Sequence, residues 1–326
     1  MTTIRLAAGL CTGLAVSVLP LALAADVPAM PGSWANAAPL PEERTEISAA
    51  TDGERLFLLG GFAPSADARA DAPTAVYAYN PAEDEWTPIT DLPEGVNHAG
   101  LAHLDGSLYV VGGYREATFE AIDDLRIYDI EADEWRDGPA LPTARGALAV
   151  AVHEWRIHAF GGVGGDGENT GAHEIFDPED ESWSAAADLP SPRDHIGAAT
   201  FGGEIIVLAG RDDTADTLTL NEIYDVAAGA WRGGAPVPTG RSGVAAVAPD
   251  GRVSPFGGET LDPGSTFDEA ERYDPAADAW EALPAMPTAR HGLGAAVIDG
   301  RIHVVAGGPQ AGFSFSTAHE VLEPEQ

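Results

Sequence analysis

Six tryptophans recur along the chain at nearly equal intervals. Consecutive members of the series stand 48 to 52 residues apart, and they are Trp34, Trp86, Trp135, Trp183, Trp231 and Trp280. A sequence period of about 50 residues is typical of repeat architectures, in which each unit buries its apolar face against its neighbours. The 326 residues are therefore predicted to form one stacked body, although their number alone would allow two or three domains.

Two further landmarks keep the same phase as the tryptophans. A pair of small residues follows each tryptophan, after 26 residues five times and after 27 residues in the last unit: Gly60-Gly61, Gly112-Gly113, Gly161-Gly162, Ala209-Gly210, Gly257-Gly258 and Gly307-Gly308. An aromatic residue precedes five of the tryptophans by seven residues: Tyr79, Tyr128, Phe176, Tyr224 and Tyr273. The repeat therefore extends over nearly the whole chain.

Between the landmarks, short apolar runs alternate with turn residues. In the unit that ends near Trp183, apolar runs cover residues 146–152, 156–160 and 172–176, and Asp177-Pro178 marks a turn before the tryptophan. The second run of each unit is continuously apolar, which indicates a strand buried on both faces. Each unit is therefore predicted to be a meander of four short strands, in an all-β chain.

A small pair after the second strand, followed by an aromatic residue and a tryptophan, resembles the Kelch repeat. The resemblance implies a β-propeller with four-stranded blades around a central channel, and the six small pairs predict six blades. Three positions depart from the pattern without breaking its phase. Ala209 replaces a glycine, Phe176 replaces a tyrosine, and Val96 replaces the arginine that opens most units.

The two ends of the chain are out of step with the repeat. Residues 318–324 align with residues 172–178, but the chain ends at Gln326, before the matching tryptophan. The unmatched Trp34 stands at the opposite end. The N-terminal strand around Trp34 is therefore predicted to complete the last blade, which would remove an open sheet edge.

The first residues have the pattern of a signal peptide. Arg5 precedes the apolar run 6–19, and Ala22-Leu23-Ala24 is a cleavage sequence of the small-x-small kind. We expect a signal peptide over 1–24, a single propeller over 25–326, and export to the periplasm or the exterior of a bacterial or archaeal cell. An uncleaved membrane anchor is the alternative. Because Cys11 is the one cysteine of the chain, the mature protein would contain none.

The charge of the chain excludes some partners. Fifty-two acidic residues oppose 17 arginines, with no lysine, and the net charge is −35. Such a charge repels nucleic acids and anionic membranes. An acidic surface without lysine is typical of proteins from salt-adapted organisms, because salt screens the self-repulsion. The alternative is an acidic exported protein from a GC-rich genome.

A four-stranded meander places the loops after the second and fourth strands on one face, near the mouth of the channel. The predicted ligand-binding residues of these loops are Arg44, His98, Arg115, Arg145, Arg193, His195, Arg211, Arg241, Glu259, Arg290 and His291. Guanidinium groups bind carboxylates and phosphates, and the resemblance implies that this face binds partners or ligands. The alternative for the repeated arginines is structural, through bonds to backbone carbonyls or to acids of a neighbouring blade.

Two function classes fit these residues. We favour a non-catalytic, monomeric binding module for a protein or an anionic glycan. The alternative is an enzyme resembling the periplasmic Kelch sialate mutarotases, which would use an arginine for the substrate carboxylate and Glu259 or a histidine as acid or base. Copper chemistry like that of galactose oxidase needs a cysteine linked to a tyrosine, so the absence of a mature cysteine argues against it.

No cofactor or metal is predicted from the sequence. The spacing of His98, His195 and His291 does not require a metal, although the three could meet around a channel. Asp212-Asp213 and Asp216 lack the spacing of a defined calcium loop, so a solvated acidic loop is the better interpretation.

Overall fold

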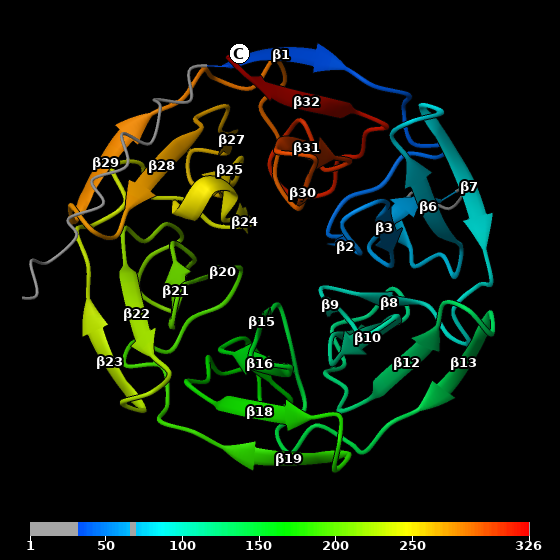
Figure 1. Cartoon of the computed structure of the whole chain (residues 1–326), viewed down its shortest axis with the longest axis horizontal. Coiled ribbons are helices and arrows are strands. Elements are labelled where there is room, and N and C mark those ends of the chain that lie inside the picture. Colours follow the sequence, from blue (N-terminus) through cyan, green and yellow to red (C-terminus); the bar gives the residue numbers. More distant parts are fainter. Residues whose placement is uncertain (1–31, 66–69, 326) are drawn as a thin grey trace, which may run out of the picture.

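The computed structural model describes residues 32–65 and 70–325, so the predicted signal peptide lies outside the described residues. In the described part, short sheets stand in a ring around a central axis (Figure 1). The one helical segment there is the 3-10 turn η1 (Pro249–Gly251). None of the described residues belongs to a helix long and apolar enough to cross a membrane.

Five of the sheets are blades of four antiparallel strands. From the channel outward, the first two blades consist of β2 (Ser48–Thr51), β3 (Leu56–Leu59), β6 (Val76–Asn80) and β7 (Glu85–Ile89), and of β9 (Gly100–Leu104), β10 (Ser107–Val111), β12 (Leu125–Asp129) and β13 (Glu134–Asp137). The next two consist of β15 (Ala149–His153), β16 (Arg156–Phe160), β18 (His173–Asp177) and β19 (Ser182–Ala185), and of β20 (Gly197–Phe201), β21 (Glu204–Leu208), β22 (Asn221–Asp225) and β23 (Ala230–Gly233). The last of the five consists of β30 (Gly294–Ile298), β31 (Arg301–Val305), β32 (His319–Pro324) and β1 (Gly32–Asn36). The predicted meander is confirmed in these five units.

The remaining unit, between β23 and β30, is built differently. Here β24 (Ala245–Val247) pairs with β25 (Ser254–Phe256), and β28 (Glu271–Asp274) pairs with β29 (Ala279–Ala282). Isolated bridges, and no continuous ladder, join β25 to β28. The prediction of six four-stranded blades is therefore corrected to five, and the other unit consists of two hairpins.

A proline explains the interrupted ladder. The bridge between Val253 and Tyr273 sets a register in which Pro255 lies opposite Glu271. Proline has no backbone N–H, so it cannot donate the hydrogen bond that this position of a central strand requires. The two hairpins stay adjacent but do not form one regular sheet.

The N-terminal strand closes the ring, as predicted. β1 pairs antiparallel with β32, and Trp34 lies opposite Leu322 (Figure 1). Buried residues of the first and last units also pack together, with Leu58 and Val305 in one apolar cluster. Strand pairing and apolar packing therefore both join the two ends of the described chain.

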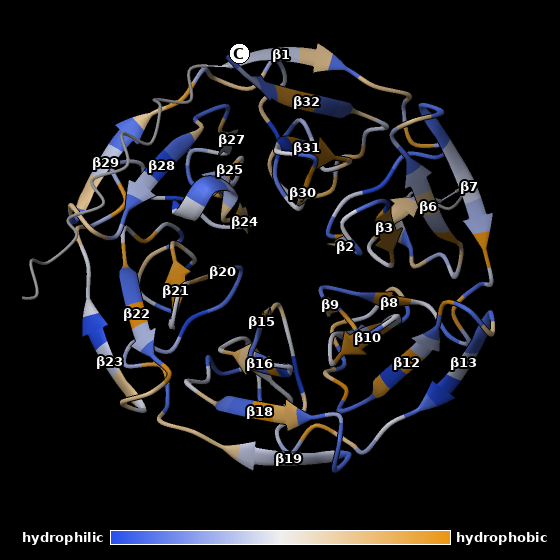
Figure 2. Cartoon of the chain, in the orientation of Figure 1, coloured by the Kyte–Doolittle hydropathy of each residue, from blue (hydrophilic) through white to orange (hydrophobic). Residues whose placement is uncertain are grey.

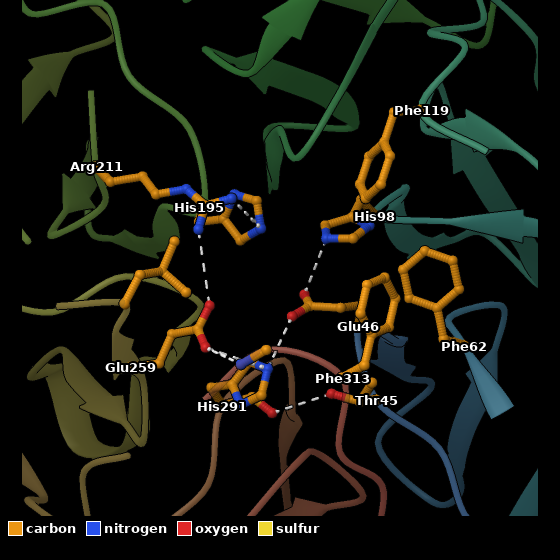
Figure 3. Close-up of a pocket in the computed structure, with 12 residues that line it drawn as sticks. Thr45, Glu46, Phe62, His98, Phe119, His195, Arg211, Glu259, His291 and Phe313 are labelled. Atoms are coloured by element: carbon orange, nitrogen blue, oxygen red, sulfur yellow. Dashed lines mark hydrogen bonds and ion pairs between the residues drawn. The ribbon is translucent and has the colours of Figure 1, made fainter. Parts of the chain in front are cut away.

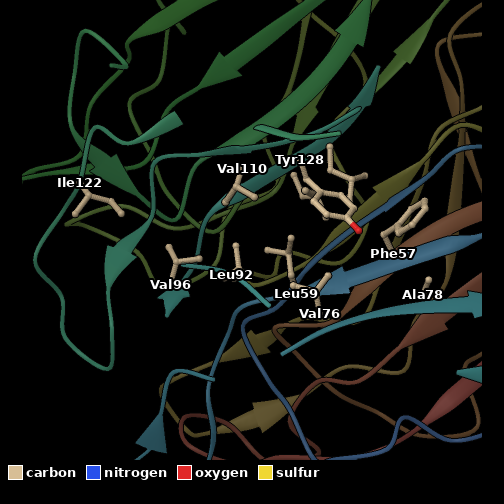
Figure 4. Packing of buried hydrophobic residues seen from close by; sticks show 11 residues of the cluster. Phe57, Leu59, Val76, Ala78, Leu92, Val96, Val110, Ile122 and Tyr128 are labelled. Atoms are coloured by element: carbon tan, nitrogen blue, oxygen red, sulfur yellow. The ribbon is translucent and has the colours of Figure 1, made fainter. Parts of the chain in front are cut away.

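The core lies between neighbouring units. The second strand of a unit is its most apolar part (Figure 2). Both faces of this strand are buried against the neighbouring units. Phe57 and Leu59 on β3 share a cluster with Val110 on β10 of the next blade (Figure 4). Similar clusters lie between the other neighbours, so each unit depends on the adjacent ones for burial.

The repeated tryptophans attach each unit to the one before it. The indole Nε1 donates in every case to a backbone carbonyl of the connection that enters the unit. The pairs are Trp34 to Pro284, Trp86 to Ala38, Trp135 to Thr90, Trp183 to Pro139, Trp231 to Ala187 and Trp280 to Ala235, at 2.8 to 3.0 Å. The tryptophans are thus part of the scaffold.

The small pairs make a tight turn with left-handed backbone. Gly161 and Gly162 have φ of 58° and 99°, and Ala306 and Gly307 have φ of 53° and 94°. The structural pair of the last unit is therefore Ala306-Gly307 and not Gly307-Gly308, which restores the spacing of 26 residues from Trp280. At the second position a Cβ on Gly162 would lie 2.5 Å from the carbonyl oxygen of Gly146, so that position requires glycine.

Two pairs of histidines are buried between blades. Nδ1 of His158 lies 2.9 Å from Nε2 of His173, and Nδ1 of His303 lies 3.0 Å from Nε2 of His319. Burial lowers the pKa of His158 to about 3 and the pKa of each of the other three to about 4. These histidines are therefore neutral in the folded protein at neutral pH.

We expect the double substitution His158→Tyr and His173→Leu to reduce the loss of stability in acid. A neighbouring blade carries Tyr109 and Leu125 at the equivalent positions. The unfolded chain protonates each histidine below about pH 6.5, whereas the folded chain does so only near pH 3 to 4. Each histidine therefore lowers stability by up to about 1.4 kcal/mol per pH unit as the pH falls through this window.

The measurement compares urea unfolding at about pH 7 and about pH 5 in the wild type and the double variant. Carboxylates whose pKa is lowered in the folded chain, such as those of Asp84 and Asp278, also lose stabilising contacts in acid, but this contribution is common to both proteins. A smaller loss between the two pH values is expected for the variant, and an equal loss would contradict the assignment.

Candidate functional site

Six residues at equivalent positions form a ring around the channel. They stand two residues after the unit-opening position and are Glu46, His98, Ala147, His195, Gly243 and Gly292. All six have left-handed backbone, with φ between 52° and 68°. The amide of each residue from His98 onward donates to the carbonyl of the ring residue before it, and the amide of Ile47 donates to Gly292. We call these six residues the channel ring.

A second set of positions forms the wall above the channel ring. The residue just before each ring residue pairs with the residue just after a small pair. The pairs are Thr45 with Phe62, Asn97 with Tyr114, Gly146 with Val163, Asp194 with Arg211, Ser242 with Glu259 and His291 with Gly308. Two of these pairs belong to short two-stranded sheets, which are β8 (Val96–Asn97) with β11 (Tyr114–Arg115) and β14 (Arg145–Gly146) with β17 (Val163–Gly164). Glu259 also pairs with Thr266 in a short hairpin of β26 (Glu259–Thr260) and β27 (Ser265–Thr266).

These positions enclose a pocket of about 220 Å³ at the mouth of the channel (Figure 3). Its lining consists of Thr45, Glu46, Phe62, His98, Phe119, His195, Arg211, Glu259, Leu261, His291, Gly312 and Phe313. An adjoining cavity of about 80 Å³ continues along the channel ring. A pocket of this size accommodates a small organic ligand or a single side chain of a partner.

One half of the pocket floor is a chain of carboxylates and imidazoles. Nε2 of His98 lies 3.3 Å from a carboxylate oxygen of Glu46, and Nε2 of His291 lies 3.3 Å from the other oxygen. Nε2 of His291 also lies 3.5 Å from Glu259, whose carboxylate accepts a 2.8 Å hydrogen bond from the amide of Gly312. These side chains come from four different units, and the ring closure brings them together (Figure 3).

The other half of the floor is organised by Asp194. Its carboxylate accepts a hydrogen bond from Nδ1 of His195 and another from Nε of Arg211, at 3.0 Å. An NH2 group of the Arg211 guanidinium lies 3.2 Å from Nε2 of His195. Asp194 therefore fixes the orientation of both side chains, and His195 directs Nε2 into the pocket.

The floor contains groups in different protonation states. Burial lowers the pKa of His98 to about 3, so this imidazole is neutral. Burial also disfavours charge on His291, but its bond to Glu46 and the nearby Glu259 outweigh this effect and raise its pKa. The pKa of Glu46 is lowered, because its contacts with the histidines outweigh the cost of burial. A carboxylate of lowered pKa, a neutral imidazole and an imidazole of raised pKa thus meet within a few ångströms.

The rim of the pocket is apolar and exposed. Phe119 and Phe313 are 66% and 64% exposed, and Leu261 is 50% exposed. These are three of the four large apolar side chains that are exposed in the described part of the chain, and the fourth is Trp155. Phe62 lies beneath the rim, with ring centroids 6.2 Å from Phe119 and 5.3 Å from Phe313. Exposed apolar side chains that gather around a pocket are typical of a binding surface.

The structure separates the predicted site residues into two groups. His98, His195, Arg211, Glu259 and His291 all line the pocket. The five repeated arginines are fully buried inside the units and donate to backbone carbonyls and to a glutamate. They are Arg44 with Glu42, Arg145 with Glu174, Arg193 with Glu222, Arg241 with Glu271 and Arg290 with Glu320.

Arg115 also stands away from the pocket. It forms an ion pair with Glu94 at 2.5 Å and is partly exposed. Glu46, Thr45, Phe62 and Phe119 also line the pocket, and they are not among the residues predicted from the sequence. Glu46 could have been found from its position in the repeat, because it stands two residues after Arg44, as His195 stands two residues after Arg193.

Comparison with known proteins gives consistent matches for the fold. The chain matches the family model of the Kelch motif over residues 43–93 and 96–142. It is 32% identical over 146 residues to Kelch-like protein terF of Aspergillus terreus, covering 41% of this chain and 31% of that protein. It is 29% identical over 132 residues to Kelch-like protein 33 of Homo sapiens, covering 40% of this chain and 24% of that protein. The chain thus spans less than a third of the length of these relatives.

Among solved structures, the structure of YjhT superposes with a TM-score of 0.73 and 18% sequence identity. The match covers 87% of this chain and 96% of that chain. At this identity the likeness establishes the fold. Radial antiparallel sheets around a channel define a β-propeller, and this one has a pocket at the mouth of its channel.

The repeat motifs of this propeller match the Kelch motif. The matched Kelch motifs and the Kelch-like relatives agree with the phase of the tryptophans and small pairs. The chain carries Kelch motifs over residues 43–93 and 96–142 and has a β-propeller fold.

Proposed function

We propose that this protein is a small-ligand-binding Kelch propeller whose ligand is a neutral sugar or a molecule of similar size. The carrying observation is the apolar rim of Phe119, Leu261 and Phe313 around a buried polar floor. Aromatic faces cover the apolar face of a sugar ring, while carboxylates and imidazoles bind hydroxyl groups.

The charges of the floor favour a neutral ligand over the anionic one expected from the repeated arginines. Among the described residues that line the pocket, Arg211 is the one arginine, and it is already bound to Asp194. Glu46 and Glu259 lie within ion-pair distance of His291, and Glu259 also lies 3.7 Å from Arg211, so their negative charges offset the positive charge of this half of the pocket. An added anion would therefore meet no excess of positive charge.

Ligand-observed NMR on a panel of neutral sugars, polyols, sugar acids and short peptides tests this proposal. We expect saturation transfer to neutral sugars in the wild type and its loss in the double variant Phe119→Ala and Phe313→Ala. Trp155→Ala is the matched control, because it removes an aromatic ring of equal exposure away from the pocket. Binding that survives in the double variant, or a panel in which only peptides bind, would contradict the proposal.

A sugar-converting enzyme is the second candidate, and the position of His291 favours it. This histidine lies between Glu46 and Glu259 with a raised pKa, as a general acid would. The same NMR samples report anomer exchange of each sugar, sialic acid included. Acceleration that falls by about 100-fold or more in Glu259→Gln would support catalysis. Sugar binding without faster anomer exchange would support the binding function and argue against catalysis of this reaction.

A further inference from the structure

Three side chains of the channel ring converge on one point. Glu46, His98 and His195 come from three different blades, and one ligand atom of each lies within 4.8 Å of the others. Nε2 of His98 and the nearer oxygen of Glu46 are 3.3 Å apart. Two ligands of a tetrahedral Zn²⁺ ion, each about 2.0 to 2.1 Å from the metal, are separated by about 3.3 Å. We propose that Glu46, His98 and His195 bind a divalent transition-metal ion, independently of any organic ligand.

The second ring nitrogen of each imidazole is held in the manner of a metal ligand. Nδ1 of His98 donates to Oδ1 of Asn97, 2.5 Å away. The amide nitrogen of Asn97 donates to the carbonyls of Tyr114 and Glu116, which fixes its oxygen toward the histidine. Nδ1 of His195 donates to the carboxylate of Asp194. Both imidazoles therefore present the lone pair of Nε2 to the pocket, with the orientation that such outer contacts give to metal-binding histidines.

The donor set selects the kind of metal. Two imidazoles and one carboxylate suit Zn²⁺ and related transition metals, whereas Mg²⁺ and Ca²⁺ prefer oxygen donors. Three protein ligands leave at least one coordination position free for water or a bound molecule. All three side chains line the pocket. The other oxygen of Glu46 lies 3.3 Å from Nε2 of His291, which orients the carboxylate toward the two metal-binding imidazoles.

A second group of possible ligands, Glu46, Glu259 and His291, fits a metal less well. Nδ1 of His291 donates to the carbonyl of Gly308, and its Nε2 lies within 3.5 Å of both carboxylates. A doubly protonated imidazole satisfies all three acceptors without a metal. His291 is therefore assigned as a partner of Glu46 that orients it.

One contact competes with the metal. The NH2 group of Arg211 lies 3.2 Å from Nε2 of His195 and donates to the lone pair that a metal would use. Because the guanidinium is planar, Arg211 must move as a whole to release Nε2 of His195, and its partly exposed side chain allows this movement. This competition yields a specific expectation: Arg211→Gln binds the metal more tightly than the wild type.

The test uses the untagged protein, stripped with a chelator, and isothermal titration with Zn²⁺ in high salt and excess Ca²⁺. The salt and Ca²⁺ occupy the acidic surface, so the remaining binding reports on imidazole sites. We expect one Zn²⁺ per chain and affinities weakened at least about 100-fold in Glu46→Gln, which preserves the side-chain shape, and in His195→Gln. His103→Ala is the control, because His103 lies on β9 away from the site.

Co²⁺ provides a second readout, because direct coordination by nitrogen and oxygen ligands produces visible d–d absorption. The proposal is supported if this spectrum is lost in His98→Gln and His195→Gln, while circular dichroism shows both variants folded. It is overturned if the wild type binds no Zn²⁺ under these conditions, or if the ring variants bind as tightly as His103→Ala. Neither result depends on sugar binding, so the two proposals can fail separately.

Discussion

Replacing Arg193 with methionine is expected to destabilise the propeller by about 3 to 5 kcal/mol, because it breaks a buried ion pair. The guanidinium has no exposed surface, and it donates to the carbonyls of Ser191, Val207 and Ala209 and to the carboxylate of Glu222. The substitution leaves these acceptors without donors and Glu222 with an uncompensated buried charge. The loss would be a large fraction of the stability of a typical domain.

Arg232→Met is the matched control. Arg232 forms an ion pair with Glu204 at 2.7 Å, but its side chain is 46% exposed. Exposed pairs of this kind contribute about 1 kcal/mol or less. The urea midpoint should therefore fall far more for Arg193→Met than for Arg232→Met, and adding Glu222→Gln should recover part of the loss. Equal midpoints for the two single variants would show that the repeated arginines do not support the fold.

Removing the N-terminal strand is expected to have a comparable effect. A chain that begins at Ala37 lacks β1, and its loss exposes the edge of β32 and the apolar side chain of Leu322. It also removes the hydrogen bond from the Trp34 indole to Pro284 and the edge-to-face contact of Trp34 with Phe256. Several ladder hydrogen bonds at about 1 kcal/mol each, together with the lost burial, give a destabilisation on the order of 5 kcal/mol.

The comparison chain begins at Gly32 and keeps β1. Thermal unfolding of the two chains should differ strongly, and the shorter chain should also aggregate through the open edge of β32. Trp34→Ala is the corresponding point variant, expected to cost about 2 kcal/mol, with the exposed Trp155→Ala as its control. A chain beginning at Ala37 that melts like the longer one would refute closure through β1.

The periodic residues of the sequence predicted most of this architecture, because each performs the same task in every unit. The tryptophans, the small pairs and the closure by Trp34 were all accessible as repeated positions. The exceptions come from residues that occur once. Pro255 removes one ladder donor and splits a blade, and Ala306 takes a left-handed position that the sequence had suggested for Gly307.

The candidate site was predicted in part for the same reason. The chain has 9 histidines against 52 acidic residues, so His98, His195 and His291 stand out near the starts of three units. Glu46 is one of 52 acidic residues, and nothing distinguishes it until its ring position is known. The repeated arginines carried the strongest signal, yet the structure buries them, because a residue needed in every unit stabilises the repeat.

The channel ring has a consequence for how such a protein can acquire new specificity. Its six members share one left-handed conformation, which glycine, asparagine, aspartate and histidine adopt more readily than other residues. At Gly243 an added Cβ would meet no atom closer than 3.5 Å, and Ala147 already carries one. Polar residues can therefore be exchanged at these two positions without altering the backbone bonds that join the blades. The side chains at the channel mouth are separate from the residues that hold the blades together, so the chemistry of the mouth can change while the scaffold stays intact.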